Sequence, residues 1–99
     1  MVNHIVLWSF QKELTEVQKK EAGETIRKKL EAVKEQAEGV ISLQVVVNEL
    51  SSSNKDIGLI SSFESIEALN AYQVHPLHVE AGAYIKSVTC DRVCLDYES

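Results

Sequence analysis

The stretch VNHIVLWSF at residues 2–10 is apolar on both sides of an extended chain. Successive side chains of a β-strand point to opposite faces of the sheet, so one face of this segment carries Val2, His4, Val6, Trp8 and Phe10. The other face carries Ile5 and Leu7. A strand with two apolar faces is stable only when both are covered. The segment therefore predicts a layer of cover on each side of its sheet.

The rest of the chain supplies helices for one of these layers. Thr15 and Gln18 form a capping box that opens a long helix, and Gly39 stands at its expected C-cap. Ser65 opens a second helix, which ends before Pro76, and this proline begins a further helical segment. Alternating apolar residues predict strands at 40–49, 56–63 and 90–98.

The order of these elements is typical of the α+β class with a ferredoxin-like split β-α-β-β-α-β unit. We expect residues 1–99 to form a single domain, with an antiparallel four-stranded sheet and helices on one face. The other sheet face then exposes an apolar patch, which is typical of an interface. A second copy would cover it. We therefore predict a homodimer, a dimeric α/β barrel, whose interface contains Ile5, Leu7, Val93, Leu95 and Tyr97.

Charge and cysteine content limit the expected partners. The formal net charge is −5 and the pI is near 5.1, so we predict no nucleic-acid partner. The apolar runs are far shorter than the ~20 residues that span a bilayer, so we predict no membrane partner. Cys90 and Cys94 fall in one predicted strand, where their Cα atoms would lie ~13 Å apart, too far for a disulfide. Free cysteines favour a reducing, cytoplasmic location.

The segment AYQVHPLHVEAG at residues 71–82 holds two of the three histidines. His75 precedes the only proline and stands at the N-cap of the following helix, which favours a structural role. His78 falls in the first turn, where the helix dipole lowers its pKa and favours a neutral imidazole, a general base. Tyr72 offers a hydroxyl to a substrate carbonyl or enolate. Together, Tyr72 and His78 suit proton abstraction next to a carbonyl; the alternative is a buried polar network.

A metal site is a weaker interpretation of the same residues. His4, His75, His78 and Glu80 carry suitable donor atoms. However, His75 and His78 straddle a helix start, and no His-x₃-His pair is present. We therefore predict no metal and no cofactor.

Several segments together resemble a known family. HIVLWSF near the start, FESIEALNAYQVHPLHVEAG at residues 63–82 and LDY near the end are similar to the stress-responsive dimeric α/β-barrel (Dabb) family. The resemblance implies a small dimer of this fold. The family includes a plant polyketide cyclase that uses a tyrosine and a histidine beside a cavity between sheet and helices. These residues match Tyr72 and His78, with His4 facing the same cavity and His75 matching the histidine before proline.

The chain also departs from that cyclase at two positions. Ile57 stands where the cyclase has a histidine, and Thr89 ends the last helix without the cyclase's bulky aromatic residue. The resemblance therefore implies a related site with a different substrate.

Two classes of function remain, and whether the protein is an enzyme stays open. One is a polyketide-cyclase-like or isomerase-like protein that binds a small apolar or carbonyl-bearing molecule. The other is a highly stable, non-catalytic stress-associated protein; a cofactor-free monooxygenase-like barrel is a further alternative. A cavity on the order of several hundred cubic ångströms reaching Tyr72 and His78 would favour the first class. In the predicted pocket, Tyr72 and His78 form the roof. The floor and sides are formed by His4, Val6, Trp8, Ile57, Leu59 and His75.

Overall fold

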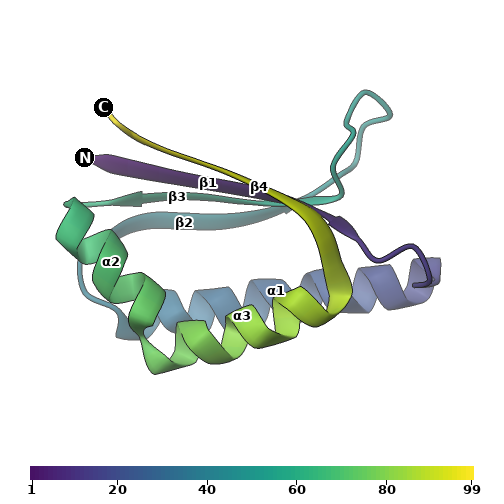
Figure 1. Ribbon diagram of the computed structural model, residues 1–99, viewed down its shortest axis with the longest axis horizontal. Helices are drawn as coiled ribbons and strands as arrows, with labels where there is room; N and C mark the ends of the chain where they lie inside the picture. Colours follow the sequence, from purple (N-terminus) through teal and green to yellow (C-terminus); the bar gives the residue numbers. More distant parts are fainter.

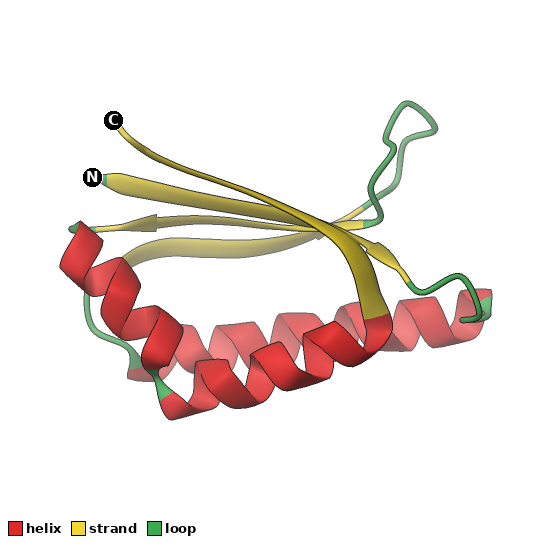
Figure 2. Cartoon of the chain, in the orientation of Figure 1, coloured by secondary structure: helices red, strands yellow, loops and turns green.

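The computed structural model describes Met1–Ser99 and contains four strands and three helices. In chain order these are β1 (Val2–Phe10), α1 (Glu16–Gln36), β2 (Val40–Val47), β3 (Ile57–Phe63), α2 (Ile66–Val74), α3 (Pro76–Val88) and β4 (Thr89–Glu98). The helices lie on one side of the sheet, and α1 runs beside α3 (Figures 1 and 2). No helix is both long enough and apolar enough to cross a membrane.

The sheet has the strand order β2-β3-β1-β4, and every neighbouring pair is antiparallel. β1 and β3 are therefore central, and β2 and β4 are the two edges. The predicted ferredoxin-like α+β fold is confirmed, including the predicted division of the last helical region into two helices, which meet at His75. The residue before a proline is disfavoured in helical geometry, so the chain bends at this position.

The covered face of the sheet forms the core of the molecule. Alternate residues of β1 are buried against the helices, and Val6 is only 1% exposed. The helices contribute Ile26, Leu30, Val33, Leu69, Tyr72, Ala81 and Ile85. Full burial of a large apolar side chain contributes roughly 1.5–3 kcal/mol each, so this layer accounts for much of the folding free energy.

The open face of the sheet carries no helix (Figure 1). Ile5 and Leu7 of β1 are half-buried there. Cross-strand pairing places Leu95 opposite Ile5 and Val93 opposite Leu7. The exposed apolar members of this face are Val46, Ile60, Val93, Leu95 and Tyr97, which are 36–60% exposed. Within one chain, the second layer predicted from β1 is absent.

Local signals set the helix ends. The capping box is present: the Gln18 backbone N–H donates to Thr15 Oγ1 (3.1 Å), and the Thr15 backbone N–H donates to Gln18 Oε1 (2.8 Å). Helix α1, however, is capped at Ala37, earlier than predicted. Gly39 instead forms the following turn with φ of 79°, a left-handed conformation that glycine adopts without strain. A Cβ at this position would lie 2.6 Å from Ala68 Cβ.

Two strands differ in detail from the prediction. β2 ends at Val47, and a register shift between Val40 and Ser42 leaves Ile41 50% exposed, although Leu43 and Val45 are buried as the alternation predicts. β4 has an irregularity opposite β1 between Leu7 and Ser9, next to Asp91, whose φ is 52°. Such bulges change which face a side chain occupies, so simple alternation fails at these points.

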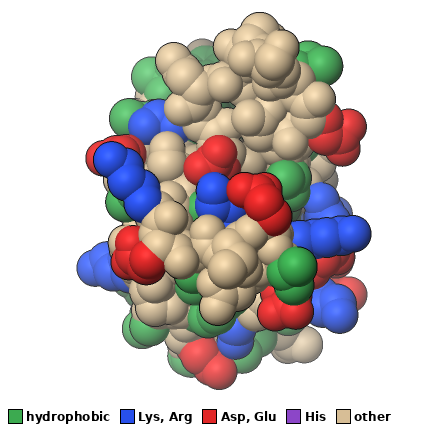
Figure 3. All heavy atoms as spheres, turned by 90° about the vertical axis from the view of Figure 1, so that its right-hand side faces the viewer, with side chains coloured by type: hydrophobic (Ala, Val, Ile, Leu, Met, Phe, Trp, Pro, Cys, Tyr) green, Lys and Arg blue, Asp and Glu red, His purple; other side chains and the backbone are tan.

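One end of the molecule carries a mixed charged surface. This is the end where α1 begins and where the loop between β2 and β3 projects. Lys and Arg side chains there are interspersed with Asp and Glu, with hydrophobic side chains between them (Figure 3). Mixed charge of this kind is ordinary for a solvated surface.

Candidate functional site

Tyr72 lies in the last turns of α2, with its ring facing the sheet. Together with Leu69 it forms the buried side of this short helix, and it is fully buried. Its hydroxyl oxygen is a buried polar atom without a hydrogen-bond partner. Burial raises the pKa of the Tyr72 hydroxyl well above its usual value, so the group stays protonated. The side chain therefore presents a neutral, unused hydrogen-bond donor inside the molecule.

His78 lies in the first turn of α3, directly against Tyr72. The two ring centroids are 4.6 Å apart and the rings are inclined at 60°, an edge-to-face contact. Burial is the main cause of a lowered pKa for His78; a backbone contact with Gln73 opposes this shift. Electrostatic interactions with His4, Arg92 and His75 lower the pKa of His78 further. The imidazole is therefore neutral near pH 7, the state required of a base.

His75 joins α2 to α3 and caps the second of these helices. Its Nδ1 accepts a hydrogen bond from the backbone N–H of Leu77 (3.1 Å), and Pro76 follows as the first helical residue. The capping role read from the sequence is present. Because Nδ1 is engaged with the backbone, the cap also fixes the direction in which α3 begins and hence where His78 lies.

A row of aromatic rings continues from His78 toward β1. Phe63, at the end of β3, has its ring centroid 5.0 Å from that of Tyr72 and 6.4 Å from that of His4. His4 is buried on the covered face of β1. The structure thus gathers Tyr72, His78 and His4 at one end of the covered layer, with Phe63 between the tyrosine and His4.

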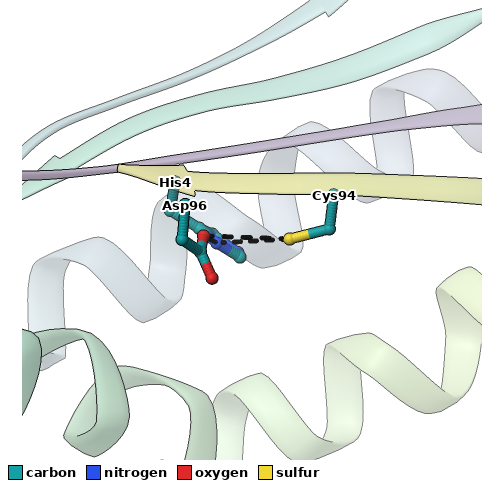
Figure 4. Close-up of side chains that lie close together, drawn as sticks. All are labelled: His4, Cys94 and Asp96. Carbon is teal, nitrogen blue, oxygen red and sulfur yellow. Dashed lines mark hydrogen bonds and ion pairs between the residues drawn. The ribbon is translucent and has the colours of Figure 1, made fainter. Parts of the chain in front are cut away.

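His4 has two further neighbours that come from β4. Its Nδ1 is hydrogen-bonded to the carboxylate of Asp96, and the thiol of Cys94 lies 3.9 Å from the same nitrogen. Figure 4 shows all three side chains converging on the helix side of the sheet. Burial and the Asp96 charge raise the pKa of the Cys94 thiol, whereas Arg92 lowers it. The sequence alone does not reveal this cluster, because the pairing of β1 with β4 cannot be read from either segment by itself.

The other residues predicted for the pocket lie deeper in the core. Val6 pairs with Leu59, and Trp8 pairs with Ile57; all four are at most 6% exposed. Trp8 is four residues along β1 from His4, a distance of ~13 Å in an extended strand. Ile57 packs beneath Gly23 of α1. The structure therefore separates Trp8 and Ile57 from the end of the layer that holds Tyr72.

Three surface hollows lie away from Tyr72 and His78. One of about 730 Å³ is formed by β2, the start of β3 and the loop between them. A second of about 540 Å³ lies beside Phe10 and the beginning of α1. A third of about 250 Å³ lies between α1 and α3, beside Leu77 and Ala81. His78 is half-buried, whereas Tyr72 is fully buried.

The fold and these side chains define a ferredoxin-like α+β protein with a polar cluster at one end of its covered layer. The family model described as "Stress responsive A/B Barrel Domain" (Dabb) matches residues 2–99. The chain therefore belongs to the Dabb family, as the sequence resemblance predicted.

Solved structures share this fold. A dimeric protein of unknown function with a ferredoxin-like fold from Bacteroides fragilis NCTC 9343 is 26% identical, with a TM-score of 0.92 over 99% of this chain and 95% of that chain. A dimeric ferredoxin-like protein from Thermobifida fusca YX is 21% identical (TM-score 0.84; 99% and 90% covered). The hydroxynitrile lyase from Passiflora edulis is 15% identical (TM-score 0.78; 97% and 90% covered). No curated protein matches the chain in sequence.

Proposed function

We propose that the protein binds a small carbonyl-bearing molecule beside Tyr72 and His78 and transfers a proton at the carbon next to the carbonyl. The observation that carries this proposal is the unpartnered hydroxyl of Tyr72, whose ring packs edge-to-face against that of His78. A buried donor without a partner costs about 1–3 kcal/mol, whereas a phenylalanine would fill the same space without that cost. The hydroxyl is therefore free to bond a ligand oxygen.

The chemistry follows from the protonation states of the two groups. The Tyr72 hydroxyl, protonated because it is buried, donates to the carbonyl oxygen of the ligand. Neutral His78 takes the proton from the adjacent carbon, and the electron pair of the broken C–H bond forms the enolate. Return of the proton to another carbon gives isomerisation. Attack of the enolate on a second carbonyl gives an aldol-type ring closure.

The second element of the proposal is a homodimer formed through the open sheet face. The apolar side chains of β1, β3 and β4 on this face are exposed in one chain, although they belong to a continuous apolar surface. Pairing with a second copy would bury them, and a specific interface needs roughly 1,000 Å² or more in total. The dimeric state named for the Bacteroides and Thermobifida proteins supports this assembly.

Hydrogen–deuterium exchange tests the proposed reaction without knowledge of the natural substrate. Aryl methyl ketones are incubated with the protein in D₂O, and loss of the α-hydrogen signal is followed by NMR. We expect exchange above the buffer rate, and a fall of roughly 10²–10⁴-fold in His78→Ala and Tyr72→Phe. Tyr84→Phe is the matched control, because Tyr84 lies on α3 beneath Lys29, away from this site. Exchange that is equal in all variants would contradict the proposal.

Two observations favour the non-catalytic alternative: Tyr72 is completely buried, and the three hollows described above lie away from Tyr72 and His78. If Tyr72 and His78 serve only to pack the end of the covered layer, His78→Ala should lose thermal stability and no ketone should bind. Melting curves of His78→Ala need no substrate and test the packing role directly. Retained stability together with lost exchange supports the proton-transfer site.

A further inference from the structure

The backbone of the sheet places three metal-binding side chains together on its covered face. His4 of β1 pairs directly with Asp96 of β4, and Val6 pairs with Cys94. Side chains of directly paired residues are about 4.5–5.5 Å apart at Cβ, and diagonal neighbours about 7–8 Å. Cys94 and Asp96 are two residues apart on one strand, so they point the same way as His4. The arrangement is thus set by strand register.

The donor atoms of these side chains already lie close together. Cys94 Sγ is 3.9 Å from His4 Nδ1 and 3.8 Å from Asp96 Oδ1, and His4 Nδ1 is hydrogen-bonded to Asp96 Oδ1. All three atoms lie within 4.8 Å of one another. A tetrahedral zinc site, with bonds of about 2.3 Å to sulfur and about 2.0–2.1 Å to nitrogen or oxygen, separates its ligand atoms by roughly 3.3–3.6 Å. To admit the ion, the nitrogen and oxygen must move apart, and the sulfur must approach them by a few tenths of an ångström.

We propose that His4 Nδ1, the Cys94 thiolate and the Asp96 carboxylate bind one divalent transition-metal ion of the zinc class. A thiolate and an imidazole select a borderline ion such as Zn²⁺ over Mg²⁺ or Ca²⁺, which prefer oxygen ligands. The two negative ligands balance the charge of the ion. Three protein ligands leave the fourth tetrahedral position to water, the composition of zinc sites that take part in reactions.

Binding involves a defined redistribution of protons. In the metal-free protein, the His4 ring uses Nδ1 for its hydrogen bond to Asp96. The ion takes the place of the hydrogen at this nitrogen, so the neutral ring carries its proton on Nε2 instead. The Cys94 thiol releases its proton to solvent as the S–metal bond forms. The Asp96 carboxylate changes its partner from the imidazole to the ion.

The site combines a fixed ligand with two accessible ones. The His4 side chain is 3% exposed and the Asp96 side chain 43%, and Cys94 is exposed. Ions can therefore reach the cluster from the side of the edge strand while the buried imidazole holds its position. The cluster lies on the covered face of the sheet, so pairing of two open faces would leave it accessible. The proposal does not depend on proton transfer at Tyr72 and His78.

Cobalt(II) is the probe for the test, because a thiolate bound to Co²⁺ gives an intense near-ultraviolet charge-transfer band. We expect the reduced wild-type chain to bind one Co²⁺ with this band, and Zn²⁺ to displace it. Cys94→Ser should abolish the band, and Asp96→Asn should weaken binding by at least roughly 10-fold. Cys90→Ser is the matched control, since its thiol contacts the Phe10 carbonyl and not His4. A band that survives in Cys94→Ser, or no binding by the wild type, overturns the proposal.

Nitrogen-15 NMR of the wild-type histidines gives a second measurement that needs no variant. On addition of Zn²⁺, the Nδ1 resonance of His4 should shift to the metal-bound range, and the ring proton should appear on Nε2. His75 and His78 should keep their spectra. A response at His75 or His78 without one at His4 would overturn the assignment of the ligands.

Discussion

The two faces of the sheet are both apolar, yet only one is covered within the chain. On the covered face, Val6 and Phe63 are at most 1% exposed beneath the helices. On the open face, Leu95 is 60% exposed and Val93 47%. Similar strand composition thus has two outcomes: one face is buried by helices of the same chain, and the other stays exposed in the single chain. Apolar content on a strand therefore predicts that a face needs cover but does not say what provides it.

A charge on the covered face should have the largest effect. Val6→Asp places a carboxylate in a layer with no partner for it, and an unpaired buried charge costs several kcal/mol or more. We expect the variant to be unfolded at every protein concentration, as measured by far-ultraviolet circular dichroism. A folded Val6→Asp chain would mean that the covered layer is far looser than its burial indicates.

The same charge on the open face should separate chains without unfolding them. In Leu95→Asp the carboxylate is exposed in the single chain, so the fold should survive. In the proposed dimer it would be desolvated, and we expect association to weaken by about 10²-fold or more. Analytical ultracentrifugation of wild type and variant measures this change. A wild-type protein that is monomeric at micromolar concentration would contradict the proposed dimer through the open face.

Tyr72→Phe tests the polar end of the covered layer. The substitution removes a buried hydroxyl that has no hydrogen-bond partner. No bond is lost and a desolvation cost disappears, so we expect the free energy of unfolding to stay unchanged or to rise by about 1 kcal/mol. Urea denaturation provides the measurement. A decrease of more than about 1 kcal/mol would mean that the hydroxyl is bonded in solution.

The pH dependence of stability should report on His78, with the smallest effect. Its pKa is lowered by folding, so the unfolded chain binds more protons than the folded one as the pH falls toward the ordinary value near 6.5. Stability should therefore decrease as the pH falls from about 7 to 5. His78→Ala should reduce this slope strongly, and His75→Asn, which keeps a capping side chain and removes only the smallest contribution to the shift, should reduce it much less. The other groups that lower the pKa of His78, His4 and Arg92, are unchanged in both variants.

Periodicity and capping chemistry were sufficient to predict the fold. The capping box at Thr15, the helix start at Ser65 and the break at Pro76 depend on residues close in sequence, so a linear reading finds them. The cluster of His4, Cys94 and Asp96 could not be found in this way. Its members are up to 92 residues apart, and they meet only because of the register between β1 and β4. Alternation placed Cys94 and Asp96 on one face, which was the only available signal.

The prediction of the pocket also depended on local sequence patterns alone. Alternation assigns Val6, Trp8 and Leu59 to the covered face correctly, but it does not give their distance from a helix on that face. Register places Ser61, rather than Ile57, opposite His4. The bend at His75 decides where His78 meets Tyr72, and the angle of that bend is not contained in a periodic pattern.

The two edge strands differ in their protection against unwanted strand pairing. β4 carries charged residues along its length, among them Asp91, Arg92, Asp96 and Glu98, and charge on an edge discourages the addition of a further strand. β2, with the sequence VISLQVVV, carries no charge and no proline. A short, uncharged, β-branched segment at an edge is typical of sites at which fibrils nucleate. During folding or heat stress, β2 is therefore the strand from which aggregation of this chain would begin.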